Sequence, residues 1–222
     1  MPESPTRRTA ESLTQAYDFF NAALFDGKLP PCLITLQRRQ GAYGFFSGGR
    51  FASTGNPDEI RDEIALNPSH FGSRRPREIL STLVHEMTHL WQHHFGKPSR
   101  AGYHNRQWAK KMHSLGLIPI GNSPTEEKAT GQRVSYGMEE GGACERACGA
   151  FLASGPTLLY QDRPTEAGNK PPTSRGKTKY TCPRCQVKVW AKPALLLLCV
   201  ACQQTLQVAS AERGQGAESG VL

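Results

Sequence analysis

The strongest hydrophobic pattern in the chain lies between Pro76 and Gly96. Apolar side chains recur there at helical spacing, and polar residues fill the positions between them. Proline in the first turn and glycine after the last turn are typical helix boundaries. The pattern therefore predicts a long amphipathic helix, whose apolar stripe is Ile79, Leu80, Leu83, Val84, Met87 and Leu90.

Shorter patterns predict the elements around this helix. Apolar residues at helical spacing indicate further helices, and short β-branched or aromatic runs indicate strands. The helix that follows residue 104 turns Trp108, Met112 and Leu115 inward. The expected helices cover residues 13–24, 104–115 and 144–152, and the expected strands are residues 33–36, 43–46, 63–66 and 157–160. Helices and strands in this mixed order predict an α+β fold.

Composition divides the chain into segments. Residues 161–179 are rich in Pro, Gly, Lys and Thr, which is typical of a linker. We expect disorder at residues 1–9, a main domain at 10–122 and an accessory segment of the core at 123–160. The linker then leads to a cysteine module at residues 180–208 and a disordered tail at 209–222.

The composition indicates a soluble protein. Mean hydropathy is −0.51, and the first residues contain no apolar segment typical of a secretory signal. The longest apolar run, residues 194–201, is far shorter than the roughly 20 residues that cross a bilayer. We therefore expect a monomer in the cytoplasm, with a place at the nucleoid included, and no membrane partner.

Positive charge gathers in the second half of the chain. The net charge is +8, and residues 163–192 hold eight basic residues against one acidic residue, Glu166. A basic stripe favours a polyanionic partner, nucleic acid first. The alternative is a solvated linker with ordinary solubility charge.

The motif HEMTH, residues 85–89, lies in the middle of the strongest predicted helix. His85 and His89 are four residues apart and therefore share one helix face, where both can bind one cation. Glu86 is one step round the helix, close enough to act on a metal-bound water as a general base. This pattern is typical of a zinc-dependent peptidase.

A catalytic zinc ion requires a third protein ligand. His93 continues the series, but about 12 Å of helix rise separates it from His85, which is too far for one ion. His104 is the best choice, because it follows the turn at residues 97–102 and opens a predicted helix. Glutamate alternatives are Glu126, Glu139 and Glu145. We expect the other histidines, His70, His93, His94 and His113, to be ordinary core residues.

Two C-x2-C pairs near the C-terminus predict a second metal site. Each pair presents two thiolates to one ion, and thirteen residues separate the pairs. Four protein ligands leave no position for water, so this site is structural. The four expected zinc ligands of this ribbon are Cys182, Cys185, Cys199 and Cys202. The remaining cysteines are expected to be core thiols, and a pair of redox dithiols is the alternative for the ribbon.

Aromatic and basic residues alternate within the cysteine module. Aromatic faces flanked by cations suit stacking of unpaired bases, with phosphate contacts around them. The expected nucleic-acid contacts are Tyr180, Arg184, Lys188, Trp190 and Lys192. The alternative is that Trp190 packs the small core of the ribbon itself.

Four stretches of the chain resemble the SprT family, which includes the Spartan-type proteases. They are LFDGKLP, EIALNP, TLVHEMTHLWQHHFGK and GYHNRQWAKKMHSLGL, and the resemblance covers residues 13–120. It implies a zincin-like fold, a third zinc ligand at His104 and a C-terminal zinc ribbon that binds single-stranded DNA. Many family members have glycine after this histidine, where this chain has Asn105.

The resemblance also implies a mode of action. Substrate in extended form would pair with an edge strand, for which residues 63–66 are the candidate, and Tyr43, Tyr103 and Tyr136 are alternatives for the oxyanion donor. We expect a zinc metalloendopeptidase that cleaves proteins bound or crosslinked to DNA. The alternatives are a nucleic-acid-binding regulatory protein with a vestigial zincin core and a zinc hydrolase acting on non-peptide amides or esters.

Overall fold

The computed structural model describes residues 4–120, 129–132, 134–155, 160–163 and 177–208. The chain divides into two compact units, Met1–Pro164 and Thr165–Leu222. The division falls within the stretch expected to be a linker. No helix in the described part of the chain is long and apolar enough to cross a membrane.

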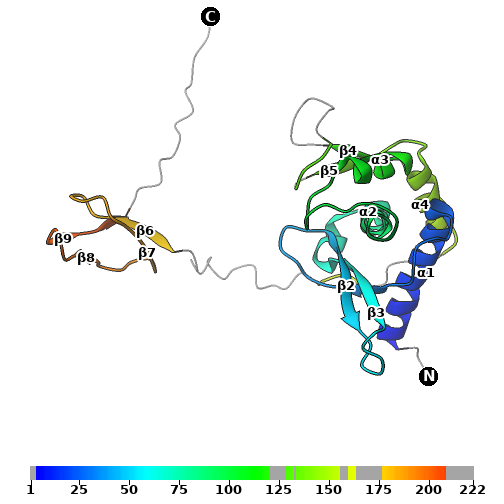
Figure 1. Cartoon of the computed structure of the whole chain (residues 1–222), viewed down its shortest axis with the longest axis horizontal. Helices are drawn as coiled ribbons and strands as arrows, with labels where there is room; N and C mark the ends of the chain where they lie inside the picture. Colours follow the sequence, from blue (N-terminus) through cyan, green and yellow to red (C-terminus); the bar gives the residue numbers. More distant parts are fainter. Residues whose placement is uncertain (1–3, 121–128, 133, 156–159, 164–176, 209–222) are drawn as a thin grey trace, which may run out of the picture. The chain divides into compact units, whose positions relative to one another are not determined.

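The central element of the first unit is helix α2, Pro76–Phe95. Figure 1 looks down its axis and shows the other elements of the unit arranged around it. Its first turn is closed by the backbone N–H of Arg75, which donates to the Glu78 carboxylate at 2.9 Å. The apolar stripe predicted for this helix is buried, so α2 forms the middle of the core.

A three-stranded sheet packs against α2. Its order is β1 (Leu33–Leu36), β3 (Ile60–Leu66) and β2 (Gly44–Ala52), with β1 parallel and β2 antiparallel to β3. Residues 63–66 therefore lie in the central strand, and the expectation that they form the edge strand was wrong. All four residues, including Glu63, are buried, which reflects cover on both faces of the strand. The edge strand beside α2 is β2.

Two helices cover another side of the core. Helix α1, Pro5–Phe25, begins eight residues before the helix expected from the sequence, so residues 5–9 are helical and the expectation of disorder there was wrong. Its N-terminal proline suits the first helical turn. Helix α4, Ala143–Ala153, packs against it through the rings of Phe19, Phe20 and Phe151. A short 3-10 helix, Pro68–Ser73, leads from β3 toward α2.

A hairpin absent from the sequence-based expectations completes the first unit. Strand β4, Leu117–Ile120, follows helix α3, Arg106–Ser114, and pairs with β5, Ser135–Met138. This pairing and the burial of α4 make residues 134–155 part of the main core. The expected strand at 157–160 falls largely outside the described residues.

The second unit is a small arrangement of short strands. Strand β6, Thr178–Thr181, lies between β7, Lys188–Ala191, and β10, Gln207–Val208, while β8, Leu198–Cys199, pairs with β9, Gln204–Thr205. Its buried hydrophobic cluster consists of Tyr180, Cys182, Cys199 and Leu206. A core of this size is too small to fold a domain without a further constraint.

Candidate active site and metal centres

Three histidines from two elements converge on one point. His85 and His89 project from successive turns of α2, and His104 precedes α3. One ring nitrogen of each lies within 4.8 Å of those of the other two. The ring centroids are separated by 5.1 Å for His85 and His89, 5.4 Å for His85 and His104, and 4.9 Å for His89 and His104. This geometry fits a single cation between the rings.

The backbone around His104 holds its ring in place. His104 and Gly131 exchange backbone hydrogen bonds of 2.8 and 2.9 Å. The ring Nδ1 of His104 also lies 3.0 Å from the Gly131 carbonyl oxygen. Because a carbonyl only accepts, this contact places the proton on Nδ1 and leaves Nε2 free to bind a metal.

Asn105, the residue after this ligand, forms hydrogen bonds to both α3 and α2. Its side-chain oxygen accepts from the Trp108 backbone N–H at 3.0 Å and so caps α3. The same oxygen accepts from Gln92 of α2 at 2.7 Å. The residue that departs from the glycine of many SprT-family members therefore fastens α3 to α2 next to His104.

Trp108 lines the histidine cluster. Its ring stacks on His89 at 5.3 Å with an interplanar angle of 21°, and it lies 4.2 Å from the His104 ring. Sequence analysis placed Trp108 in the core but gave it no place in the site. Its position three residues after Asn105, on the first turn of α3, determines this contact.

Burial keeps the three imidazoles neutral. It lowers the pKa of His85 well below its usual value, lowers the pKa of His89 to about 3 and lowers that of His104 as well. The neighbouring rings add to the effect for His85 and His89. Neutral imidazole is the form that binds metal ions. The buried Nδ1 atom of His85 has no hydrogen-bond partner among the described residues.

Glu86 lies buried beside the histidines. Its Oε1 atom is 3.9 Å from His85 Nε2. Burial raises its pKa to about 8, although the positive charge of Arg39 and the backbone N–H of Phe46 both oppose that rise. Arg39 and the Phe46 N–H were not identified from the sequence, because only the fold brings them to α2.

Strand β2 passes directly over Glu86. A Cβ atom at Gly44 would lie 3.2 Å from Glu86 Oε1 and 2.9 Å from Thr82 Cγ2. Such contacts are closer than side chains tolerate, so glycine at this position lets the strand approach the helix. The edge strand of the sheet is therefore the strand next to the candidate general base.

The tyrosines considered for an oxyanion donor lie in different surroundings. The Tyr136 ring lies 5.0 Å from the His85 ring, and its hydroxyl is 3.3 Å from Thr82 Oγ1. The Tyr43 ring packs instead on Arg74 and His70. Tyr103 lines a separate cavity. Tyr136 is thus the tyrosine in contact with the cluster.

The glutamate alternatives for the third ligand do not join the histidines in the described part of the chain. Glu145 Oε2 accepts from the Gly141 backbone N–H at 2.7 Å, and its Oε1 faces Arg77. Glu139 packs beside Gly142. Glu126 lies outside the described residues.

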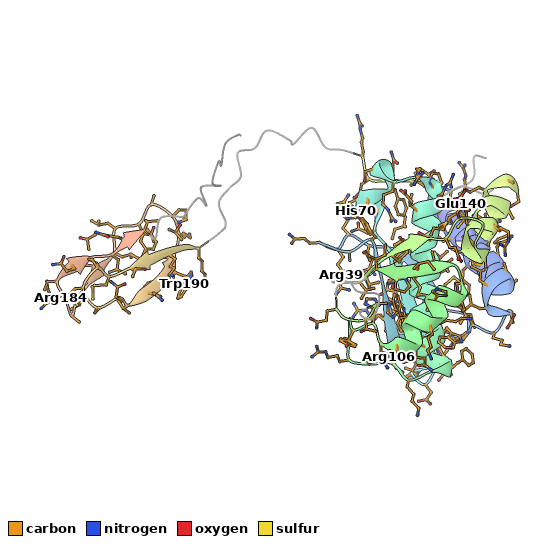
Figure 2. All side chains as sticks on the ribbon, turned by 90° about the horizontal axis from the view of Figure 1, so that it is seen from above. Arg39, His70, Arg106, Glu140, Arg184 and Trp190 are labelled. Carbon is orange, nitrogen blue, oxygen red and sulfur yellow. The ribbon has the colours of Figure 1, made fainter. Side chains whose placement is uncertain are left out.

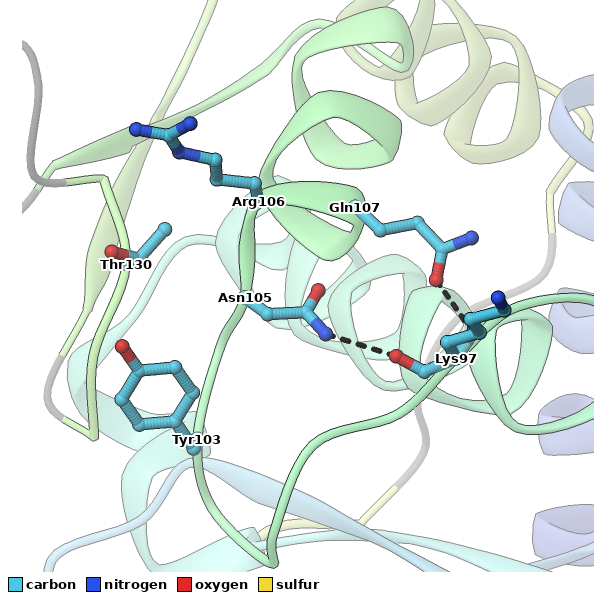
Figure 3. Close-up of a pocket in the computed structure, with 6 residues that line it drawn as sticks. All are labelled: Lys97, Tyr103, Asn105, Arg106, Gln107 and Thr130. Carbon is cyan, nitrogen blue, oxygen red and sulfur yellow. Dashed lines mark hydrogen bonds between the residues drawn. The ribbon is translucent and has the colours of Figure 1, made fainter.

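A cavity of about 550 Å³ opens beside His104. Its lining comprises Lys97, Tyr103, Asn105, Arg106, Gln107 and Thr130. Figure 3 shows Tyr103, Thr130 and Arg106 around the same space, with Asn105 and Gln107 bonded to the Lys97 backbone. The cavity lies next to the cluster, and none of the three histidines lines it.

The four ribbon cysteines converge in the second unit. Their sulfur atoms all lie within 4.8 Å of one another. Cys185 Sγ and Cys199 Sγ are 3.7 Å apart. Two thiolates bound to one tetrahedral zinc at about 2.3 Å are separated by about 3.8 Å. The geometry fits a closed four-sulfur site.

The expected nucleic-acid contacts differ in exposure. Tyr180 is 1% exposed, and its hydroxyl donates to the Lys192 carbonyl and accepts from the Leu195 N–H. The expectation that Tyr180 stacks on a base was therefore wrong, because it fills the core of the ribbon. Trp190 is 57% exposed and does not take that core position. Figure 2 shows Arg184 and Trp190 at opposite ends of this unit.

Trp190 lies on a basic strand face. Antiparallel pairing sets it opposite Lys179, and Lys188 lies two residues away in the same strand. Side chains two apart in a strand, and those directly opposite, share one face of a sheet. Lys188 and Lys192 are exposed. The exposed aromatic ring thus has lysines on two sides.

The remaining histidines are not core residues as expected. His93, His94 and His113 are exposed, and His70 is half-buried. His93 and His94 lie with Asp62 in a further group of ligand-type side chains within 4.8 Å of one another. The apolar stripe of α2 ends before its last turn, which leaves these two positions at the surface.

Comparison with known proteins identifies the family of this chain. The model of the SprT-like family matches residues 13–128. A Salmonella typhimurium protein described as an uncharacterized protein in the mucB 3' region is 57% identical over 47 residues, which cover 21% of this chain and 64% of that protein. The chain thus spans less than two thirds of the length of this relative. No solved structure matches. The family match extends over more than half of the sequence, and the chain belongs to the SprT-like family.

Proposed function

We propose that this chain is a zinc-dependent metalloendopeptidase that acts on proteins bound or crosslinked to DNA. Membership of the SprT-like family indicates a zincin-like metallopeptidase domain. The observation that carries the proposal is the convergence of three neutral histidines next to the buried Glu86. A catalytic zinc site requires this combination of three protein ligands and a nearby base.

In this proposal His85, His89 and His104 hold the catalytic zinc. When bound, the ion would lower the pKa of a coordinated water and polarise the scissile carbonyl. The Gly131 carbonyl fixes the ring of His104, and Trp108 restricts the movement of His89 and His104. Rigid ligands keep the site ready for substrate.

Glu86 is the proposed general base. It takes a proton from the attacking water and later delivers a proton to the leaving amine. The Phe46 N–H and the charge of Arg39 stabilise its ionised form against the effect of burial. Tyr136, which touches His85, is the proposed donor to the oxyanion.

The substrate is proposed to bind along β2 in extended form. Among the described residues the strand neighbouring β2 is β3, which leaves the other edge of β2 without a strand partner. An extended peptide can pair with such an edge through main-chain hydrogen bonds that tolerate many sequences. The contact between Gly44 and Glu86 supports this choice, because it brings the strand to the base.

The ribbon is proposed to hold a structural zinc ion and to bind single-stranded DNA. Its four cysteines are the metal ligands, and Trp190 stacks on a base while Lys188 and Lys192 contact phosphates. Arg184 would contact the same strand farther along. The basic surface near His104 supports DNA close to the catalytic unit as well. Residues 87–125 contain Lys97, Arg100, Arg106, Lys110 and Lys111 but no Asp or Glu.

A cleavage assay tests both parts of this proposal. The full chain is incubated with a basic DNA-bound protein, with and without single-stranded DNA and with and without a chelator. We expect DNA-stimulated cleavage that disappears with the chelator and in Glu86→Gln. Glu145→Gln, which alters a carboxylate in the first turn of α4 away from the histidine cluster, is the matched control and retains cleavage.

The outcomes separate the alternatives. Equal cleavage by wild type and Glu86→Gln would contradict the peptidase mechanism. Equal cleavage with and without single-stranded DNA would contradict only the DNA part of the proposal. DNA binding without cleavage under any condition would favour the regulatory protein with a vestigial core, and cleavage of small amides but not of protein would favour the non-peptide hydrolase.

A further inference from the structure

A third group of ligand-type side chains lies at the far end of α2 from its N-terminus. Asp62 comes from β3, and His93 and His94 come from the last turn of the helix. One oxygen of the aspartate and one nitrogen of each histidine lie within 4.8 Å of one another. Neither the peptidase mechanism nor the ribbon uses these residues.

The distances in this group fit an ion after a small adjustment. His94 Nε2 lies 2.6 Å from Asp62 Oδ2, and His93 Nε2 lies 3.9 Å from Asp62 Oδ1. Ligand atoms bound to one tetrahedral ion at about 2.1 Å are separated by about 3.4 Å. The observed distances lie on either side of this value, and both histidines are exposed side chains at the end of a helix. Rotation of their rings can adjust both distances toward this value.

The backbone of β2 accommodates the side chains of Asp62 and His93. The Gly49 N–H donates to Asp62 Oδ1 at 2.7 Å, and Gly49 has a positive φ of 58°. A Cβ atom at Gly48 would lie 2.8 Å from His93 Cε1, so any larger residue would displace the ring. The strand pairing shifts register between Ser47 and Phe51. This bulge gives Asp62 a fixed donor and gives His93 its place.

The carboxylate is available as an anionic ligand. Burial raises the pKa of Asp62, but the Gly49 N–H and the His94 ring more than offset this effect and lower the pKa overall. Asp62 is 7% exposed, whereas His93 and His94 open to solvent. An ion at this point has protein ligands on one side and water on the other.

We propose that Asp62, His93 and His94 form a third metal site, which takes a divalent transition-metal ion such as Zn2+, Ni2+ or Cu2+. Two imidazoles and one carboxylate are the donors that these ions favour. The site is separate from the histidine cluster, because it uses its own three ligands. A bound ion would tie the bulge of β2, the strand β3 and the end of α2 together. The inference is independent of the peptidase activity.

Metal titration of the full chain tests this site. The chain is first saturated with zinc and dialysed, so that the histidine cluster and the ribbon stay occupied. Ni2+ and Zn2+ are then titrated by calorimetry, and thermal unfolding is followed with and without the added ion. We expect one further equivalent to bind and the unfolding temperature to rise.

Variants identify the ligands. His93→Ala and His94→Ala each weaken the additional binding by roughly tenfold or more and remove the temperature shift. His113→Ala removes an exposed histidine of α3 and is the matched control, with binding unchanged. Retention of the zinc held after dialysis checks that each variant is folded, and Asp62→Asn serves if one histidine variant fails this check. No further equivalent in wild type, or unchanged binding in both histidine variants, would overturn the proposal.

Discussion

The histidine cluster of the first unit and the cysteine cluster of the second unit are both arranged for a metal ion, but they relate to their folds in opposite ways. Among the described residues, the unit of the histidines has 23 buried hydrophobic residues in one cluster, whereas the unit of the cysteines has four. In the first unit packing positions the ligands. In the second unit two of the four buried residues, Cys182 and Cys199, are themselves proposed ligands.

The two clusters also differ in what surrounds the ion position. Three imidazoles leave a tetrahedral zinc one open position, and Glu86 lies beside it. Four thiolates leave a tetrahedral ion no open position. We therefore expect the first unit to keep its fold without an ion and the second unit to depend on its ion for folding.

The largest expected effect concerns the ribbon. Cys182→Ser removes one thiolate, and we expect the second unit to unfold, because structural zinc supplies about 10–16 kcal/mol of folding free energy in zinc-finger peptides. NMR spectra of the full chain should lose the dispersed signals of residues 177–208 and retain those of the first unit.

His85→Ala is the matched variant in the other cluster. It should lose its zinc and leave the signals of the first unit dispersed, since the core around α2 remains. Unfolding of the first unit in His85→Ala, or a folded ribbon in Cys182→Ser, would reverse the comparison.

The second prediction concerns catalysis. Glu86→Gln keeps the shape of the side chain but removes the base, and we expect kcat to fall by about 10²- to 10⁴-fold. Zinc content should stay at the wild-type value, because Glu86 is not a proposed ligand. A loss of zinc in this variant would show that Glu86 has a different role.

The third prediction concerns Tyr136. Tyr136→Phe removes one hydroxyl near His85, and we expect kcat to fall by about 10²- to 10³-fold with little change in KM, as for other oxyanion donors. Tyr103→Phe, in the neighbouring cavity, is the control. If kcat falls equally in the two variants, the hydroxyl of Tyr136 has no specific role in the reaction.

The smallest predicted effect lies on the surface of the ribbon. Trp190→Ala should weaken single-stranded DNA binding by about 1–3 kcal/mol, which fluorescence anisotropy measures directly. Affinity should also fall steeply as salt rises. Val189→Ala, the adjacent residue on the opposite strand face, is the control and should bind DNA as wild type does.

Local patterns in the sequence predicted much of this molecule. The stripe of α2, the helical spacing of His85 and His89, and the two cysteine pairs each depend on residues close together in the chain. Because their geometry follows from helix or turn periodicity, the sequence suffices to place them. Strand β1 was predicted with the bounds that it has.

Long-range pairing explains what the sequence could not provide. The antiparallel partners β4 and β5 are distant in sequence, so no local turn signal joins them. The position of residues 63–66 within the sheet depends on the side of β3 on which β2 pairs. In the ribbon, the alternation of side chains along β6 and β7 does not reveal which face of the sheet the rest of the unit covers. For this reason Tyr180, which was expected to contact nucleic acid, lies in the ribbon core, while Trp190 is exposed. The Phe46 N–H and the charge of Arg39 act on Glu86 only when β2 and the segment before it fold against α2.

The most direct test of the central claim is the zinc content of His104→Ala after dialysis, measured by mass spectrometry together with peptidase activity. If three histidines hold the catalytic ion, the variant retains one zinc ion per chain, in the ribbon, and loses activity, whereas wild type retains two and cleaves its substrate. Two retained zinc ions with full activity in His104→Ala would contradict the account.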